Sequence, residues 1–161
     1  MLNALIVGLV TLSRLVELPI ARANTRRLLA SGGHEVAASH YPLIVALHVC
    51  WLAALWLRAL DRPINLPALV AFGLVECCRI WVLRTLGKRW TTRIVVVPGE
   101  TLVARGPYKF IRHPNYAVVT AEIALLPLVF GLWQVAIIFS LLNAAILAVR
   151  IREEDRALRA A

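Results

Sequence analysis

The side chains best suited to bind a small molecule are concentrated in residues 106–116, which read GPYKFIRHPNY. These eleven positions hold cationic side chains, one histidine, two tyrosines and two prolines. Pro114 disfavours helix at the residue before it and can itself open a helix. The stretch therefore predicts a loop that enters the first turn of a helix at Asn115 and Tyr116. The free N–H groups and the dipole of such a helix start favour a negatively charged ligand group.

A second polar stretch follows the last apolar run and reads VRIREEDRALRAA. Arg150 and Glu154 are four residues apart, so they share one face of a helix, and Glu153 and Arg156 lie to either side of that face. As a bare pattern this is most often a solvated helix end. The stretch therefore predicts that the last apolar helix continues out of the membrane.

The composition places both stretches in a membrane protein. The chain has 161 residues, enough for one domain over residues 1–161. Sixty per cent of the residues are hydrophobic and the mean hydropathy is +0.75, well above the usual soluble composition. The net charge of +9 is carried by cations that lie between apolar runs. This arrangement favours the anionic surface of a membrane as the partner, and no nucleic acid is expected.

The three cysteines, Cys50, Cys77 and Cys78, lie within apolar runs and show no CxxC or Cys/His ligand spacing. The sequence therefore indicates no metal site and no disulfide framework. The cysteines are expected to contribute to helix packing.

Five apolar runs are predicted to cross the membrane as helices. A spanning helix needs about 20 mostly apolar residues, and the last two runs, although short, are separated by Pro127 and Gly131. The first run lacks the basic start and the cleavage site of a signal peptide, so it is expected to be a retained span. The predicted spans are residues 2–21, 41–60, 64–86, 116–132 and 133–149. The expected fold is all-α and integral to the membrane.

The cations divide unequally between the two ends of these spans. Thirteen of the 18 lysines and arginines fall in the loop 22–40, the segment 87–115 and the tail from residue 150, which five spans place on one side. Only Arg58 and Arg62 fall on the other side. By the positive-inside rule, the tail and the segment 87–115 face the cytoplasm and the N-terminus faces out.

Charged residues also lie within the predicted spans. Arg14 precedes Glu17 by three residues and Glu76 precedes Arg79 by three, so each pair shares a helix face. Ionisable residues inside a span usually face the bundle or a water-filled cavity. Two interpretations stay open: the pairs are bridges that fix helix packing, or they line a pocket near the cytoplasmic face.

The segment 87–115 is not helical in pattern. RIVVV is rich in β-branched residues, TLVARG is extended, and turns are predicted at Pro98-Gly99 and Gly106-Pro107. Non-helical backbone at membrane depth is tolerated only where protein or a cavity covers it. A short hairpin or an irregular cap over the cytoplasmic mouth is expected.

GPYKFIRHPNY, two apolar spans and RIREE, in this order, resemble the isoprenylcysteine carboxyl methyltransferase family. Its members are small integral-membrane enzymes that use S-adenosylmethionine. The resemblance covers roughly residues 86–158 and rests on Gly-Pro-Tyr, Arg-His-Pro-x-Tyr and Arg-x-x-x-Glu. It implies a cofactor region over residues 87–161 at the cytoplasmic face, in a bacterial cytoplasmic membrane.

The resemblance also implies the contacts of the cofactor. Glu154 would bind its ammonium, His113 and the helix-start amides its carboxylate, and tyrosine faces its adenine or sulfonium. Arg150 would lie beside the methyl acceptor as the catalytic residue. The implied cofactor contacts are backbone groups of Glu100, Thr101, Leu102 and Val103, the pocket residues Tyr108, His113, Pro114, Asn115 and Tyr116, and Glu154 of the tail.

The stretch LGKRWTTRIVVVPG and the short tail resemble a bacterial branch of the family, the alkylpyrone methyltransferases near polyketide synthases. This implies a lipophilic acceptor such as an alkylpyrone, an alkylresorcinol or a quinone-like phenol. A carboxylate acceptor needs no general base, whereas a phenol, with a pKa of ~10, needs deprotonation or a cation such as Arg150. Three alternatives stay open: a carboxyl methyltransferase of isoprenylcysteine-type substrates, an NADPH-dependent membrane reductase with a similar His-Pro-x-Tyr stretch, and a non-enzymatic membrane protein.

Overall fold

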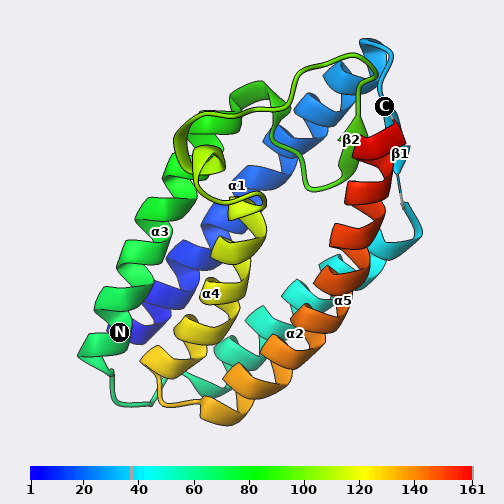
Figure 1. Cartoon of the computed structure of the whole chain (residues 1–161). Coiled ribbons are helices and arrows are strands. Elements are labelled where there is room, and N and C mark those ends of the chain that lie inside the picture. Colours follow the sequence, from blue (N-terminus) through cyan, green and yellow to red (C-terminus); the bar gives the residue numbers. More distant parts are fainter. Residues whose placement is uncertain (37, 161) are drawn as a thin grey trace.

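The structure is a computed structural model that describes residues 1–36 and 38–160, and five long helices dominate it (Figure 1). The helices are α1 (Leu2–Ala30), α2 (Tyr41–Arg58), α3 (Leu66–Leu86), α4 (Pro114–Val129) and α5 (Trp133–Ala160). Two short strands and three 3-10 turns lie between them: β1 (His34–Val36), β2 (Ile94–Val96), η1 (Ala38–His40), η2 (Gly87–Arg89) and η3 (Gly106–Lys109).

The helices have the length and the surface of a membrane bundle. By length and composition, α1, α2, α3 and α5 can each cross a membrane, whereas α4 is apolar but has 16 residues. The bundle exposes large hydrophobic side chains along its helices, among them Leu9, Leu57, Leu74 and Leu141. The predicted helical, integral-membrane fold is therefore confirmed, with four helices long enough to span.

One end of the bundle holds the apolar core and the N-terminus, together with the α2–α3 and α4–α5 connections (Figure 1). Trp51, Leu55 and Phe130 are each no more than 1% exposed there. The side-chain amide of Asn3 donates to the backbone oxygens of Ala59, at 2.7 Å, and of Arg62, at 2.8 Å. These bonds fix the start of α1 against the α2–α3 connection.

The break between the last two apolar runs falls at the predicted residues. Proline leaves no N–H for the helix ladder, and the Leu132 N–H turns back to the Pro127 oxygen at 2.9 Å. Gly131 between them has a φ of 66°, which favours glycine. The prediction that these runs form two helices is confirmed.

The opposite end carries a cap in which the RIVVV stretch does not form a hairpin with the residues that follow it. Instead β2 pairs antiparallel with β1, which lies far earlier in the chain, with Val36 opposite Ile94 and His34 opposite Val96. Arg93 beside β2 pairs with Glu35 of β1 at 2.7 Å. Of the two expected forms of the cap, the hairpin is therefore wrong.

The cysteines contradict the expectation of internal packing. Cys50 of α2 and both Cys77 and Cys78 of α3 are exposed side chains. In a membrane bundle, the lipid-facing side of a helix is as apolar as its packed side. An apolar run therefore does not reveal which of its residues are buried.

Candidate active site

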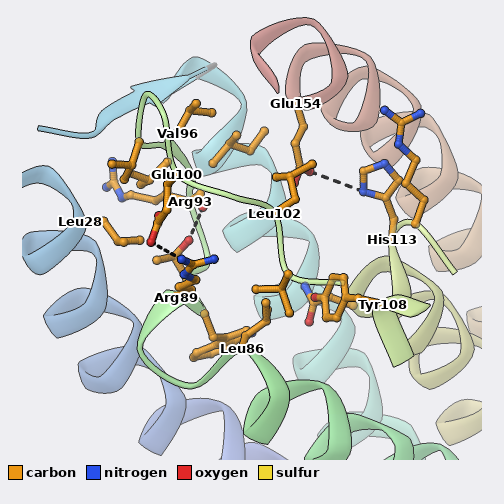
Figure 2. A pocket seen from close by; sticks show the side chains of 18 of the residues that line it. Leu28, Leu86, Arg89, Arg93, Val96, Glu100, Leu102, Tyr108, His113 and Glu154 are labelled. Atoms are coloured by element: carbon orange, nitrogen blue, oxygen red, sulfur yellow. Dashed lines mark hydrogen bonds and ion pairs between the residues drawn. The ribbon is translucent and has the colours of Figure 1, made fainter. Parts of the chain in front are cut away.

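A cleft of about 660 Å³ lies at the capped end of the bundle (Figure 2). This is in the range of ~300–1,000 Å³ typical of small-molecule sites. Three parts of the chain form most of its lining: the segment that follows α3, the junction that leads into α4, and the late turns of α5. The two polar stretches of the sequence therefore meet across one cavity.

Ten of the eleven predicted site residues line this cleft, and Pro114 does not, because it is buried as the first residue of α4. The ten are Glu100, Thr101, Leu102, Val103, Tyr108, His113, Asn115, Tyr116, Arg150 and Glu154. The cleft also contains side chains that the sequence did not single out, including Arg89, Trp90, Arg93 and Arg112.

The loop before α4 is held against α3 by close packing. Gly106 has a φ of 58°, and a Cβ atom there would lie 2.5 Å from the Thr85 Oγ1 atom. Only glycine fits both the backbone conformation and this approach. The next turn, η3, brings Tyr108 to the cleft, and α4 then begins at Pro114 as predicted.

Tyr116 is the centre of a hydrogen-bonded chain between α4 and α5. Its hydroxyl donates to Glu154 Oε2 and accepts from Arg150 Nε at 3.0 Å. Arg150 also donates from Nη2 to the backbone oxygen of Thr92 at 2.6 Å. Arg150 is 7% exposed and is thus held by two partners, one on α4 and one in the cap. The shared helix face of Arg150 and Glu154 is what directs both side chains to Tyr116.

His113 contacts the same tyrosine, and its ring points toward Glu154 (Figure 2). Its ring stacks on Tyr116, with 5.5 Å between the ring centres and 23° between the planes. Its Nδ1 atom is 3.9 Å from Glu154 Oε2, and its Nε2 atom is 3.3 Å from Asp155 Oδ1. Asp155, which also pairs with Arg112 at 3.3 Å, is a residue that sequence reasoning missed. The stack and the Asp155 contact fix the orientation of the imidazole.

The facing wall is the backbone that follows β2. Arg89 pairs with Glu100 and donates from Nη1 to the backbone oxygen of Thr101 at 2.7 Å. Arg93 packs over the Tyr41 ring, with its guanidinium carbon 4.4 Å from the ring centre. Arg89 therefore holds the irregular segment that follows β2, whereas Arg93 fixes the start of β2 against β1 and α2.

The electrostatics of the cleft suit a zwitterionic, partly aromatic ligand. Burial, together with the nearby Glu154 charge, raises the pKa of the Tyr108 phenol above its usual ~10, so the phenol stays neutral at pH 7. The carboxylates of Glu100 and Glu154 suit an ammonium, and the α4 start beside His113 suits a carboxylate. Aromatic faces suit an adenine or a sulfonium. The donor set therefore fits S-adenosylmethionine, which has all four groups.

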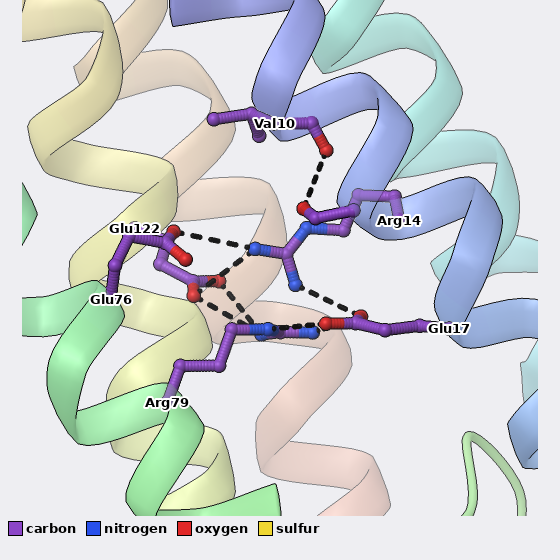
Figure 3. A network of polar contacts seen from close by, with 7 residues as sticks. Val10, Arg14, Glu17, Glu76, Arg79 and Glu122 are labelled. Atoms are coloured by element: carbon purple, nitrogen blue, oxygen red, sulfur yellow. Dashed lines mark hydrogen bonds and ion pairs between the residues drawn. The ribbon is translucent and has the colours of Figure 1, made fainter.

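A second group of charges lies inside the bundle and joins α1, α3 and α4 (Figure 3). Arg79 pairs with Glu122 at 3.0 Å and also with Glu17. Arg14 lies 3.2 Å from both Glu17 and Glu122, and 3.5 Å from Glu76. The group of Arg14, Glu17, Glu76, Arg79 and Glu122 is called the bundle network below.

The bundle network differs from the predicted pairs in two respects. Arg14 does pair with Glu17 of its own helix, but Arg79 pairs across to α1 and α4 and not with Glu76. The partner on α4, Glu122, was not predicted. The network bridges helices, which was one of the two interpretations of these charges. Its members Arg14, Glu17 and Arg79 also line a second cavity of about 230 Å³.

A helical membrane bundle with a polar cleft at one end defines an integral-membrane protein with a candidate small-molecule site. The comparisons with known proteins give the family. Residues 68–160 match the model of the isoprenylcysteine carboxyl methyltransferase (ICMT) family, and the chain belongs to this family. Members of this family are membrane methyltransferases that use S-adenosylmethionine as methyl donor.

Two relatives extend the similarity to nearly the whole chain. The chain is 38% identical over 162 residues to the protein of Bacillus subtilis (strain 168) named "Uncharacterized protein YpbQ", covering 96% of this chain and 95% of the relative. It is 24% identical over 151 residues to an "Uncharacterized protein" of Haemophilus influenzae, covering 90% and 88%. The family match begins within α3, so α1 and α2 share sequence with these relatives but lie outside the family model.

Proposed function

We propose that the chain is a methyltransferase that uses S-adenosylmethionine bound in the cleft to methylate a hydroxyl oxygen of a lipophilic small molecule. An alkylpyrone, an alkylresorcinol or a similar phenolic lipid is the proposed acceptor. The cofactor supplies an activated methyl group on its sulfonium. The protein therefore has to bind and align the two reactants and exclude water.

The observation that carries this proposal is that Arg150 and Tyr116 line both cavities. The cleft is polar around Arg150 and Tyr116. The second cavity extends from these two residues between α1, α2, α4 and α5, where apolar residues such as Leu15, Leu52 and Leu147 line it. An acceptor with an oxygen at Arg150 and a hydrocarbon part among the helices fits this junction. A soluble polar acceptor does not, because the apolar lining offers it few partners.

The residues have distinct proposed roles. Glu154 holds the ammonium of the cofactor, and His113, kept in place by Asp155, lies beside its carboxylate. Tyr116 couples the two sites, since it bonds to Glu154 on the cofactor side and to Arg150 on the acceptor side. Arg150 stabilises the negative charge of the acceptor oxygen.

An acceptor assay tests this proposal. Purified protein in detergent is supplied with labelled S-adenosylmethionine and an alkylpyrone, an alkylresorcinol or a farnesylcysteine analogue. We expect both hydroxyl lipids to be methylated more efficiently than the prenylcysteine. Efficient methylation of the prenylcysteine, with neither hydroxyl lipid accepted, would instead support a carboxyl methyltransferase.

We also propose five spans, with the cleft on the cytoplasmic side. The 16 residues of α4 have a helical length of roughly 24 Å, slightly less than the ~30 Å hydrocarbon core, and its neighbours α3 and α5 cover it. The unequal division of cations supports the orientation. A topology reporter fused after the C-terminus should report a cytoplasmic location, and one fused before the N-terminus should report an external location. Reporters located on the same side of the membrane would contradict the five-span arrangement.

A further inference from the structure

The second cavity is lined by an imidazole that the proposed function does not yet use, that of His48. His48 lies near the middle of α2 and lines the cavity together with Arg150 and Tyr116. It is the one histidine among the residues that line this cavity. Its ring also packs edge-on to Trp51, with 6.5 Å between ring centres. The imidazole is therefore fixed by its own helix and borders the space assigned to the acceptor.

The hydrogen bond of His48 determines which ring nitrogen can meet a ligand. Its Nδ1 atom is 2.8 Å from the backbone oxygen of Ile44. A carbonyl oxygen only accepts hydrogen bonds, so Nδ1 carries the proton, and in the neutral ring Nε2 has a free lone pair. Among the described residues, Nε2 has no hydrogen-bond partner. A cavity with apolar walls thus contains one neutral nitrogen that is ready to accept a proton.

The charges that line the cavity favour an oxyanion and a neutral imidazole. Arg150 can stabilise the negative charge of an acceptor oxygen. Arg14 and Arg79 of the bundle network also line the cavity, together with Glu17. Partial burial and these cations oppose a charge on the resting His48 ring, so Nε2 keeps the lone pair with which it can accept a proton.

We propose that His48 Nε2 accepts the proton of the acceptor hydroxyl, an inference that rests on the proposed function and narrows its substrate class. The O–H bond breaks, an N–H bond forms, and the hydroxyl becomes an oxyanion beside Arg150. An electron pair of that oxygen then forms the bond to the methyl carbon, while the C–S bond breaks and its pair stays on sulfur. The imidazolium returns its proton to water after product release.

The substrate class follows from the proton balance. A carboxylate is already ionised at pH 7 and has no proton to give, so His48 would be idle with such an acceptor. A phenol has a pKa of ~10 and needs a base, whereas the enol of a 4-hydroxypyrone is more acidic and needs it less. His48 therefore marks this cavity as a site for weakly acidic hydroxyl groups.

The first test compares His48→Gln with His34→Gln, a matched change at the exposed first residue of β1. His48→Gln should lower turnover of an alkylresorcinol at pH 7 by about 100-fold or more, the usual worth of a general base. His48→Gln should lower turnover of the more acidic 4-hydroxypyrone much less, and raising the pH should restore the turnover rate of the alkylresorcinol.

Other charged or titratable groups also face His48 and contribute to the pH profile of turnover. They are Arg14 and Glu17 of α1, Tyr41 of α2, Arg79 of α3, Tyr116 and Glu122 of α4, and Arg150 of α5.

The outcomes separate this inference from the proposed function. Equal losses on both acceptors, or no loss with either, would overturn the role of His48 while the wild-type activity still supports the proposed function. If the wild type methylates neither hydroxyl lipid, both proposals fail. Unfolding temperatures of the two variants show whether a loss comes from damaged folding.

The second test needs no turnover. A long-chain alkyl nitrophenol, whose ionised form absorbs visible light, is bound to the protein in the presence of S-adenosylhomocysteine. At a pH where the free probe is mostly neutral, we expect wild type and His34→Gln to bind it in the ionised form and His48→Gln to bind it in the neutral form. The same absorbance in all three proteins would overturn the proposal.

Discussion

The bundle network and the cleft both contain arginines and carboxylates, but these charged side chains differ in burial and in the number of their ionic partners. In the network, the side chains of Arg14 and Glu122 are 15% and 4% exposed, and each has more than one ionic partner. In the cleft, Glu100 and Glu154 are 37% and 26% exposed, and His113 is as far as 3.9 Å from Glu154. The network pairs its buried charges with one another. In the cleft, Glu100 pairs with Arg89 and Glu154 accepts from Tyr116, but both carboxylates are exposed enough to meet a ligand as well.

This difference separates scaffold from site. Buried charges in a membrane bundle are stable only when they are paired, so losing one partner damages the fold. Half-exposed charges around a cavity contribute little to folding and much to binding. Substitutions in the two regions should therefore have effects of different kinds, and the predictions below run from the largest effect to the smallest.

The largest effect is expected from Arg79→Met in the network. The substitution leaves Arg14 as the cation shared by Glu17, Glu76 and Glu122, so the network loses its charge balance, and an uncompensated buried charge typically costs about 3–5 kcal/mol of stability. Thermal unfolding in detergent measures this loss. Arg84→Met, at an exposed position of the same helix, is the matched control. Similar unfolding temperatures for the two variants would mean that the network does not hold the bundle together.

Arg150→Ala should instead act on catalysis. Removal of a group that stabilises an oxyanion typically lowers turnover by about 10²–10³-fold. Binding of S-adenosylhomocysteine should change far less, because the Arg150 side chain bonds to Tyr116 and Thr92 and not to Glu154. Turnover and calorimetry on one preparation measure both quantities. Arg152→Ala, which changes an exposed arginine two residues later, should leave both unchanged. A parallel loss of turnover and binding in Arg150→Ala would place this arginine with the cofactor.

Glu154→Gln should mainly weaken cofactor binding, in contrast to Arg150→Ala, which should mainly lower turnover. The Glu154 substitution removes the charge proposed to face the ammonium of the cofactor, so the affinity for S-adenosylmethionine should fall by about 1.5–3 kcal/mol, roughly 10- to 150-fold in Kd. The unfolding temperature should change little. Glu153→Gln is the control, because Glu153 pairs with Arg156 at 2.8 Å outside the cleft lining. Unchanged affinity in Glu154→Gln would mean that the family role does not transfer to this residue.

The sequence was a better guide to the cleft than to the network, for physical reasons. Arg150 and Glu154 share a face at a spacing of four, and the Pro114 helix start is a local signal. The spacing alone is most often that of a solvated helix end, and it was the resemblance to the family that implied a common cofactor site for the two stretches. Glu122 has no charged residue three or four positions away on α4, so nothing in the sequence indicated that α1 and α3 supply its partners.

Long-range pairing and lipid exposure were also beyond the sequence. The three-residue β1 has no strand signal of its own, and its partner β2 follows two helices later. Asp155 lies beside the Arg150–Glu154 face, and only the fold places it next to His113. The exposed cysteines show the same limit, since hydrophobicity marks a membrane helix but not the side of it that faces lipid.

The central claim is that the cleft is a site for S-adenosylmethionine, and direct calorimetry of the purified wild-type protein tests it most simply. Titration with S-adenosylhomocysteine should give saturable binding at one site per chain, and titration with NADPH under the same conditions should give none. Saturable binding of NADPH, or no binding of S-adenosylhomocysteine or S-adenosylmethionine by the folded protein, would contradict the account.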